Sequence, residues 1–415
     1  MPRHYLDHAS TSPARPEVVE AMLPWLTGDG AGDPGRVHTE GRMARAAVED
    51  ARDKVAAFFG ARSREVVFTS GATEATNAAV WGATRSRPRG LVLAAAVEHS
   101  AVRDASARHA EVRGIPVDGL GRIDVRWLES VLDGGTLPRH DRLRGRRPEP
   151  GRAVGVGAAE MAGPSPGGND RESPLPGDTI ALVHCQWGNH EVGTLQPAEE
   201  VVHRCREAGI LVHVDAAAAA GHVPVDFVAL GTDLMSVSAH KFGGPKGIGA
   251  LLVRRGLRLD PLVVGGDQER ARRAGLENVP AIAGFGAACE AVDLAVEARS
   301  ARLGTERVLA GAKAIAGVTS YGDSERRLPH IVCLGVDGVE AEAVLLGLDQ
   351  AGIAVHSGSA CSSEALEPSP VLGAMGVEAE RSLRVSVGWS SSPADVSALL
   401  EALPRVVGRL RALSP

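Results

Sequence analysis

Ser236-Val-Ser-Ala-His-Lys-Phe-Gly-Gly-Pro-Lys-Gly247 is the stretch of this sequence that says most about the fold. The apolar run from Leu234 to Val237 predicts a strand, which leads into a polar turn and then into glycines that leave room for a ligand. Lys241 in this turn can form a Schiff base with an aldehyde cofactor, and Ser238 and His240 are placed to hydrogen-bond a phosphate. A lone lysine beside a glycine turn is usually only a surface residue. The flanking motifs favour the chemical interpretation.

Short apolar runs alternate with amphipathic stretches over the first 290 residues. We expect strands at 66–69, 91–94, 180–184 and 210–214 as well as 234–237, and helices at 42–59 and from Thr73. This alternation predicts the α/β class, with a largely parallel sheet.

Two polar sites lie at the ends of expected strands. Asp215 ends a strand, at the edge where α/β sheets bind ligands, and it would pair with a pyridinium nitrogen. A helix cap is at least as frequent a role for a single aspartate. The turn Ser70–Asn77 joins a strand to a helix, so its backbone amides, with Ala72 and the Thr73 hydroxyl, form a phosphate cradle. A plain N-cap by Thr73 is the alternative.

Three further residues have side chains that can do chemistry. His99 follows an expected strand and can stack on a planar ring, although a single histidine there is more often structural. Arg384 lies between apolar strand neighbours and needs an anion, which is either a substrate carboxylate or a structural acid. Cys361 lies in a Ser/Gly-rich loop, 355–369, whose polar surroundings favour a reactive thiol over a buried one.

The chain divides into two expected domains. Residues 1–290 form a large cofactor-binding domain, and residues 291–415 form a smaller α+β domain that carries the Cys361 loop, with the N-terminal segment able to pack against it. Residues 134–178 are rich in Gly, Pro, Arg and Ser and predict a flexible insertion. In the smaller domain we expect helices at 308–316, 341–351 and 395–410, and strands at 331–334 and 383–387.

Composition excludes several classes of function. A formal charge of -6 and a pI near 6.2 give no support for nucleic-acid binding. No apolar run approaches the roughly 20 residues of a membrane span, and the first residues lack a signal-peptide core, so we expect a cytoplasmic protein. The five cysteines show no CxxC spacing, which argues against a disulfide framework or a metal site.

Together these segments resemble the cysteine desulfurases of the class V aminotransferase fold group, in the subgroup whose catalytic loop reads SGSAC. The likeness covers nearly the whole chain outside the insertion. It is carried by Tyr5–Ala9, Glu98–His99, His190–Gly193, Val214–Asp215, Ser238–Gly247, Gly275–Pro280, Gly358–Cys361 and Glu367–Pro368.

The resemblance implies a homodimer with an aminotransferase-like fold that binds pyridoxal 5'-phosphate on Lys241, with His99 stacked on the ring. It implies that L-cysteine is held by its carboxylate on Arg384 and that Lys241 then acts as the base. It further implies that Cys361 takes the sulfur as a persulfide and passes it to an acceptor protein.

Three positions depart from the family pattern. His190 replaces an asparagine and Ala218 a glutamine that normally contact the cofactor ring region, and Leu276 replaces a threonine lent by the partner subunit to the phosphate. His190 can partly compensate as a hydrogen-bond donor. Two alternatives stay open: a related enzyme with lyase, epimerase or aminotransferase chemistry, and a catalytically weakened paralogue with a binding role.

Overall fold

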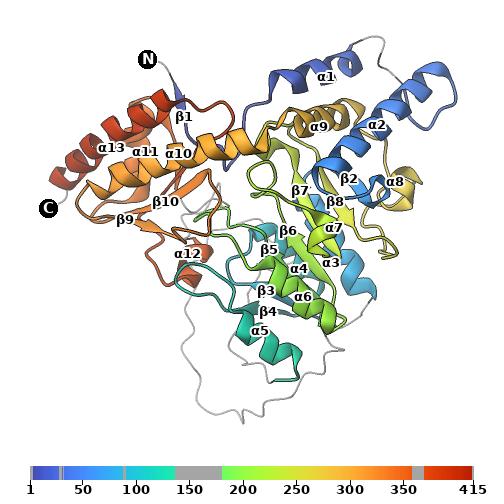
Figure 1. Ribbon diagram of the computed structural model, residues 1–415, viewed down its shortest axis with the longest axis horizontal. Helices are drawn as coiled ribbons and strands as arrows, with labels where there is room; N and C mark the ends of the chain where they lie inside the picture. Colours follow the sequence, from blue (N-terminus) through green and yellow to red (C-terminus); the bar gives the residue numbers. More distant parts are fainter. Residues whose placement is uncertain are drawn as a thin grey trace, which may run out of the picture.

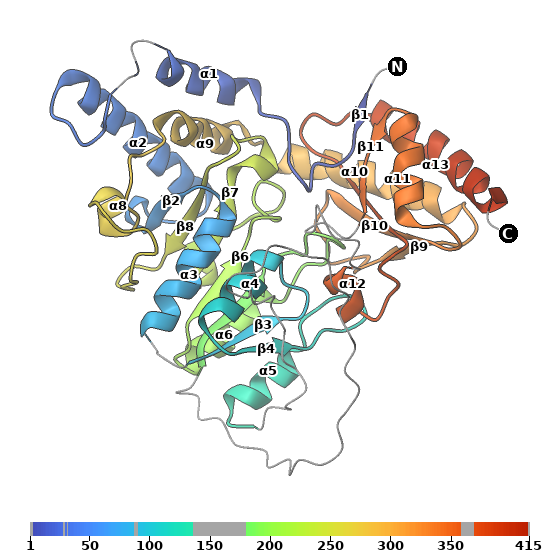
Figure 2. The same cartoon turned by 180° about the vertical axis from the view of Figure 1, so that it is seen from behind.

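The computed structural model describes residues 3–27, 30, 32–86, 90–135, 180–357 and 369–413, which form two main sheets (Figures 1 and 2). The larger sheet has seven strands in the order β2-β8-β7-β6-β5-β3-β4. Its strands are β2 (Val66–Thr69), β3 (Leu91–Ala95), β4 (Val112–Ile115), β5 (Ile180–Gln186), β6 (Val212–Asp215), β7 (Leu234–Ser238) and β8 (Gly249–Val253).

Five strands of this sheet, from β7 to β4, are mutually parallel, and β8 is antiparallel to both of its neighbours. Alternate residues of one strand enter different cores. In β3, Leu93 and Ala95 belong to the core under α2 and α9, whereas Val92 and Ala94 belong to the core under α3 and α4. A sheet covered by helices on both faces explains why all seven residues of β5 are buried.

The smaller sheet is antiparallel, in the order β12 (His356–Ser357), β13 (Ser382–Ser386), β10 (Ile331–Val336) and β9 (Val318–Tyr321). It has its own apolar core with α10 (Leu294–Lys313), α11 (Ala341–Gln350) and α13 (Pro393–Leu413). These helices gather on one side of the molecule, and α1, α2 and α9 gather on the other (Figures 1 and 2).

The N-terminal segment belongs to the smaller sheet's side. Strand β1 (His4–Tyr5) pairs in parallel with β11 (Ile353–Ala354), and Asp7 makes a further bridge to Ser386. The remaining helices are α1 (Pro16–Leu26), α2 (Thr39–Phe58), α3 (Ala72–Ser86), α4 (Ser100–His109), α5 (Val125–Leu132), α6 (Ala198–Glu207), α7 (Phe227–Leu230), α8 (Gln268–Ala271), α9 (Val279–Ala291) and α12 (Pro370–Ala374), with short 3-10 turns at η2 (Ser63–Glu65) and η4 (Ala239–Phe242).

The expected strands are all present, within two or three residues of their expected ends. The helix expected at 308–316 is only the last part of α10, which begins 14 residues earlier, and β8 was not expected. Most of the expected insertion 134–178, and Cys361 with its loop, lie outside the described residues.

In the part of the chain that is described, no single helix meets the length and hydropathy needed to span a membrane, and α9 with α10 meets them only as a pair bent by 77°.

Candidate active site

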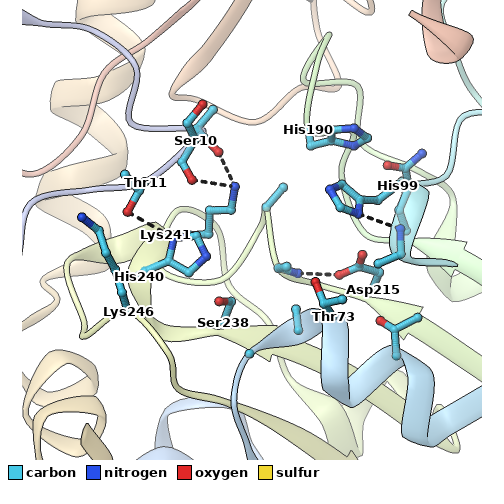
Figure 3. Close-up of a pocket in the computed structure, with 18 of the residues that line it drawn as sticks. Ser10, Thr11, Thr73, His99, His190, Asp215, Ser238, His240, Lys241 and Lys246 are labelled. Atoms are coloured by element: carbon cyan, nitrogen blue, oxygen red, sulfur yellow. Dashed lines mark hydrogen bonds between the residues drawn. The ribbon is translucent and has the colours of Figure 1, made fainter. Parts of the chain in front are cut away.

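A cavity of about 520 Å³ lies where the carboxyl ends of β5, β6 and β7 meet the N-terminus of α3 (Figure 3). This is the edge of a parallel sheet at which α/β proteins bind their ligands. Its lining includes every described residue that the sequence singled out for the site: Ala72, Thr73, His99, His190, Asp215, Ser238, His240, Lys241 and Arg384. The fold therefore brings these dispersed motifs together.

Lys241 stands on a short 3-10 turn directly after β7. The turn ends at Gly243, whose φ of 91° lies in the left-handed region that glycine adopts without strain. The Lys241 side chain crosses the cavity toward the N-terminal segment (Figure 3), where its Nζ donates to the carbonyls of Ala9 and Ser10. The amine therefore has backbone acceptors inside the cavity.

Asp215 lies at the end of β6 with its carboxylate fixed. Oδ1 accepts the amide N–H of Ala217 at 2.9 Å and the hydroxyl of Ser236 at 3.2 Å. Behind it, Glu98 is buried, and burial together with the charge of Asp215 raises the pKa of Glu98 to about 8. At neutral pH Glu98 is therefore mostly protonated and adds no full negative charge behind Asp215.

His99 and His190 form the wall beside Asp215. Their rings meet edge to face, with centroids 4.9 Å apart. Burial lowers the pKa of His99, and its Nδ1 accepts the N–H of Ala101 at 3.1 Å at the start of α4. The neutral His99 ring therefore carries its proton on Nε2.

The opposite end of the cavity is rich in hydrogen-bond donors. The buried Ser238 hydroxyl has no hydrogen-bond partner in the described part of the chain, and His240 and the Lys246 ammonium line the same cavity. The N-terminus of α3, at Ala72 and Thr73, adds backbone amides that the helix itself leaves unpaired. An orphaned donor, a helix N-terminus and a lysine together fit a phosphate group.

Arg384 is fully buried on β13 at the side of the cavity. Its Nη1 donates to the carbonyl of His190 at 2.9 Å, and its Nη2 donates to Asp7 Oδ1 at 3.0 Å and Ser10 Oγ at 2.7 Å. Nε is buried without a partner among the described residues. The sequence left open whether Arg384 pairs with a structural acid or with a substrate carboxylate. Asp7 is the structural acid, and Nε remains for a second anion.

The sequence interpretation missed several residues of the site. Ser10 and Thr11 reach the cavity from the N-terminal segment, and Gln186 reaches it from the end of β5, next to Asp215 in the sheet. No local motif marks these residues, since tertiary packing brings them in. No cluster of three or more His, Cys, Asp or Glu suited to a metal ion occurs among the residues that the structure describes.

The four described cysteines are buried: Cys185, Cys205, Cys289 and Cys333. Burial raises the pKa of the Cys205 thiol to about 12, which leaves it unreactive at neutral pH. Of the departures from the family pattern, Ala218 lines the cavity beside His190, and Leu276 is 64% exposed, away from it.

Comparison with known proteins agrees with this arrangement. The aminotransferase class-V family model matches residues 4–137 and 172–399. The cysteine desulfurase IscS 1 of Archaeoglobus fulgidus is 38% identical over 422 residues, which cover 99% of this chain and 98% of that protein. A cysteine desulfurase of Cereibacter sphaeroides is also 38% identical, over 100% of this chain and 98% of its own.

Solved structures show the same likeness. A NifS-like protein superposes with a TM-score of 0.80 at 27% identity, over 98% of this chain and 100% of its own. SspA in complex with cysteine superposes with a TM-score of 0.73 at 26% identity, over 94% of this chain and 100% of its own. With its cavity, its fold and its full-length relatives taken together, this chain belongs to the cysteine desulfurase family of class V aminotransferases.

Proposed function

We propose that this protein is a pyridoxal-phosphate enzyme that converts L-cysteine and the thiol of Cys361 into alanine and a Cys361 persulfide. The Cys361 thiolate forms a bond to the substrate sulfur, the bond from that sulfur to carbon β breaks, and the carbon takes up a proton. The persulfide then passes its outer sulfur to an acceptor protein. The observation that carries this proposal is the placement of Lys241, Asp215 and Arg384 around one cavity.

The residues present fit the cofactor. Lys241 would bind its aldehyde carbon, and Asp215 its ring nitrogen. Ser238, His240, Thr73 and the Ala72 amide would hold its phosphate. When bound, pyridoxal phosphate supplies an electron sink for carbanion chemistry at carbon α.

The side chains of this chain would do the remaining work. Arg384 donates to the substrate carboxylate from Nε, the nitrogen that has no partner among the described residues, and the Lys241 amine takes the proton from carbon α. His99 and His190, whose rings meet edge to face in the wall beside Asp215, would cover the cofactor ring. Cys361 supplies the attacking thiolate.

The decisive experiment is a visible spectrum of cofactor-saturated protein before and after addition of cysteine, with alanine and released sulfide quantified. Borohydride should fix the cofactor on Lys241, found by peptide mass spectrometry, and Lys241→Ala should abolish both the label and alanine. Lys313→Ala, which removes an exposed lysine at the end of α10, is the matched control and should change neither. Full activity of Cys361→Ser, or racemised or keto product in place of alanine, would contradict the proposal.

We also infer a homodimer. Helix α1 exposes Val19, Leu23 and Leu26 at helical spacing, each more than half exposed, and Val37 and Leu276 expose 87% and 64% of their surfaces. Large apolar side chains in contiguous groups mark interfaces. Light scattering should therefore give twice the chain mass, and Leu23→Glu should shift the equilibrium toward monomer. A monodisperse monomer at micromolar concentration would contradict this inference.

The two-domain division at about residue 290 also stays a proposal. It is supported by the core that the small sheet forms with α10, α11 and α13, whereas Ile331 and Cys333 of β10 pack into the large core. Limited proteolysis followed by mass spectrometry tests it, since cleavage should concentrate between α9 and α10.

The cytoplasmic location expected from the sequence is likewise a prediction, to be checked by cell fractionation.

A further inference from the structure

Two histidines that the reaction described above does not use are stacked face to face at the junction of the two sheets. The ring centroids of His222 and His330 are 3.5 Å apart, and the rings are inclined by only 14°. His222 lies in the turn that follows β6 of the large sheet, and His330 immediately precedes β10 of the small one. Both are buried, with exposures of 6% and 1%.

The His222 ring also contacts the backbone of the lysine turn. Its Nε2 lies 3.3 Å from the carbonyl oxygen of Lys241. A carbonyl only accepts hydrogen bonds, so His222 must carry its proton on Nε2. Burial lowers the pKa of His222 to about 3, so the ring is neutral at neutral pH.

A second donor reaches the same carbonyl from the N-terminal segment. The Ser12 hydroxyl donates to Lys241 O at 3.0 Å, and Ser12 Oγ lies 2.9 Å from Nδ1 of the buried His8. Because Ser12 uses its hydrogen on the carbonyl, His8 must donate from Nδ1. His8 Nε2 then accepts from the Ser391 hydroxyl at 3.1 Å. Each donor in this series of hydrogen bonds, from Ser391 through His8 and Ser12, is directed toward the Lys241 carbonyl.

We propose that His222 is a positioning residue for Lys241. Stacked against His330, it holds the Lys241 carbonyl together with Ser12, and so it fixes the backbone from which the lysine amine enters the cavity. The stacking partner, His330, comes from the small sheet, so the ring that donates to the Lys241 carbonyl also packs across the junction of the two sheets. The inference rests on the function proposed above, because it concerns the amine that binds the cofactor.

Two substitutions separate the hydrogen bond from the packing. His222→Phe keeps an aromatic ring against His330 but cannot donate to the carbonyl, whereas His222→Gln keeps an N–H donor and loses the stack. His109→Phe is the matched control, since His109 packs edge to face on Trp81 at 5.2 Å, in α4 and outside the cavity lining. A role in packing alone would make Phe the better replacement, and a role in positioning would make Gln the better one.

The measurement is the second-order rate constant with which cofactor-free protein captures pyridoxal phosphate on Lys241, followed by absorbance and fixed with borohydride. The loss of one neutral hydrogen bond corresponds to a roughly 3- to 10-fold effect, so His222→Phe should capture the cofactor about that much more slowly. His222→Gln should stay within about twofold of wild type, as should His109→Phe. In the loaded enzyme, His222→Phe should lower kcat for alanine formation and leave KM for cysteine within about twofold, because Arg384 is untouched.

Capture by His222→Phe at the wild-type rate would overturn the inference, as would capture by His222→Gln as slow as that by His222→Phe. Thermal unfolding midpoints of the cofactor-free variants distinguish a folding defect from a loss of positioning, because a folding defect would slow capture in proportion to the lost stability. If borohydride leaves Lys241 of the wild-type protein unlabelled, the proposed function itself fails. If wild type and His222→Phe are labelled at the same rate, only the inference about His222 fails.

Discussion

Arg384 illustrates how one buried cation can serve both a structural acid and a substrate carboxylate. Arg384 is 1% exposed, its Nη2 pairs with a structural acid, Asp7, and its Nε has no partner within the described segments. A buried cation without partners would be costly, so Asp7 holds Arg384 in place before substrate arrives. The Nε–H group can then donate to a substrate carboxylate.

We expect Arg384→Lys to raise KM for cysteine about 10- to 100-fold, because lysine keeps the charge but loses the fork, and charged hydrogen bonds contribute roughly 1.5–3 kcal/mol each. Steady-state alanine formation over a range of cysteine concentrations measures the effect. Arg381→Lys, at an exposed ion pair with Glu378, is the control and should leave KM unchanged. An unchanged KM in Arg384→Lys would remove this residue from the substrate site.

At the scale of elements, the lysine turn depends on close contact between segments. A Cβ added at Gly243 would lie 2.7 Å from Arg15 Cγ and 2.8 Å from Trp389 Nε1, at a φ of 91°. Arg15 in turn donates from Nε to the carbonyl of Phe242 at 2.9 Å. The glycine thus allows the N-terminal segment to lie directly on the turn that carries Lys241.

Gly243→Ala should destabilise the protein by about 1–3 kcal/mol and weaken cofactor binding, because strain and steric overlap displace the turn. Gly256→Ala is matched to it, with a φ of 85° and open space around its Cβ, and should show only the backbone cost of about 1 kcal/mol. Urea unfolding and cofactor titration measure the two effects. Equal losses in the two variants would show that overlap with Arg15 does not matter.

A buried ion pair joins α2, β2 and α8. Arg52 and Glu269 are each 3% exposed and meet through two hydrogen bonds of 2.7 Å, and Glu269 also accepts the amide of Phe68 at 2.8 Å. Glu269 itself has a φ of 49°, which is uncommon for a residue with a side chain. The pair therefore holds a strained segment in place.

Removal of one partner leaves the other charge buried, so Glu269→Ala should lower the free energy of unfolding by about 3–5 kcal/mol. Glu49 also pairs with Arg52, at 3.3 Å, but is 42% exposed. Glu49→Ala should therefore cost less than about 1 kcal/mol. Denaturant titration compares the two, and a similar loss in both variants would contradict the distinction.

Sequence reasoning succeeded where local signals are strong and failed where contacts are distant. The strands around Asp215 and Lys241 follow from apolar runs that end in polar turns, and the structure has them. The extent of α10 was missed because its first turns are mainly exposed, and β8 because it directly follows the glycine-rich turn. Arg52 and Glu269 are 217 residues apart, and no periodicity links them.

At the scale of the whole molecule, buried histidines make stability depend on pH. Burial lowers the pKa of His8 and His213 to about 4 and that of His222 to about 3, whereas in the unfolded chain such rings titrate near 6.5. The unfolded state thus binds more protons than the folded state below about pH 6.5. As the pH is lowered, each ring therefore reduces the free energy of unfolding by ~1.4 kcal/mol per pH unit. The raised pKa of Glu98 has the opposite effect. Between about pH 4.5 and 8 the folded state binds this proton more tightly, so Glu98 increases the free energy of unfolding as the pH is lowered.

These three rings outweigh the one carboxyl, and His184, His240 and His330, whose pKa burial also lowers, add to the proton uptake on unfolding. The free energy of unfolding should therefore fall by at least ~3 kcal/mol per unit as the pH is lowered from about 6 to 5. Urea titrations at a series of pH values measure the slope. His222→Phe should reduce the slope by ~1.4 kcal/mol per unit, and His203→Gln, at a position whose side chain is 70% exposed, should not. Stability that is constant or rises on acidification would contradict this account.

The N-terminal segment has a consequence for biosynthesis. Residues 4–15 leave the ribosome long before their partners, which are β11, Arg384, Ser391 and Trp389. A nascent chain can therefore assemble the large sheet and present the Lys241 turn while the cover over that amine is still missing. The meeting of the two chain ends then places the carbonyls of Ala9 and Ser10 beside the Lys241 amine, which donates to both.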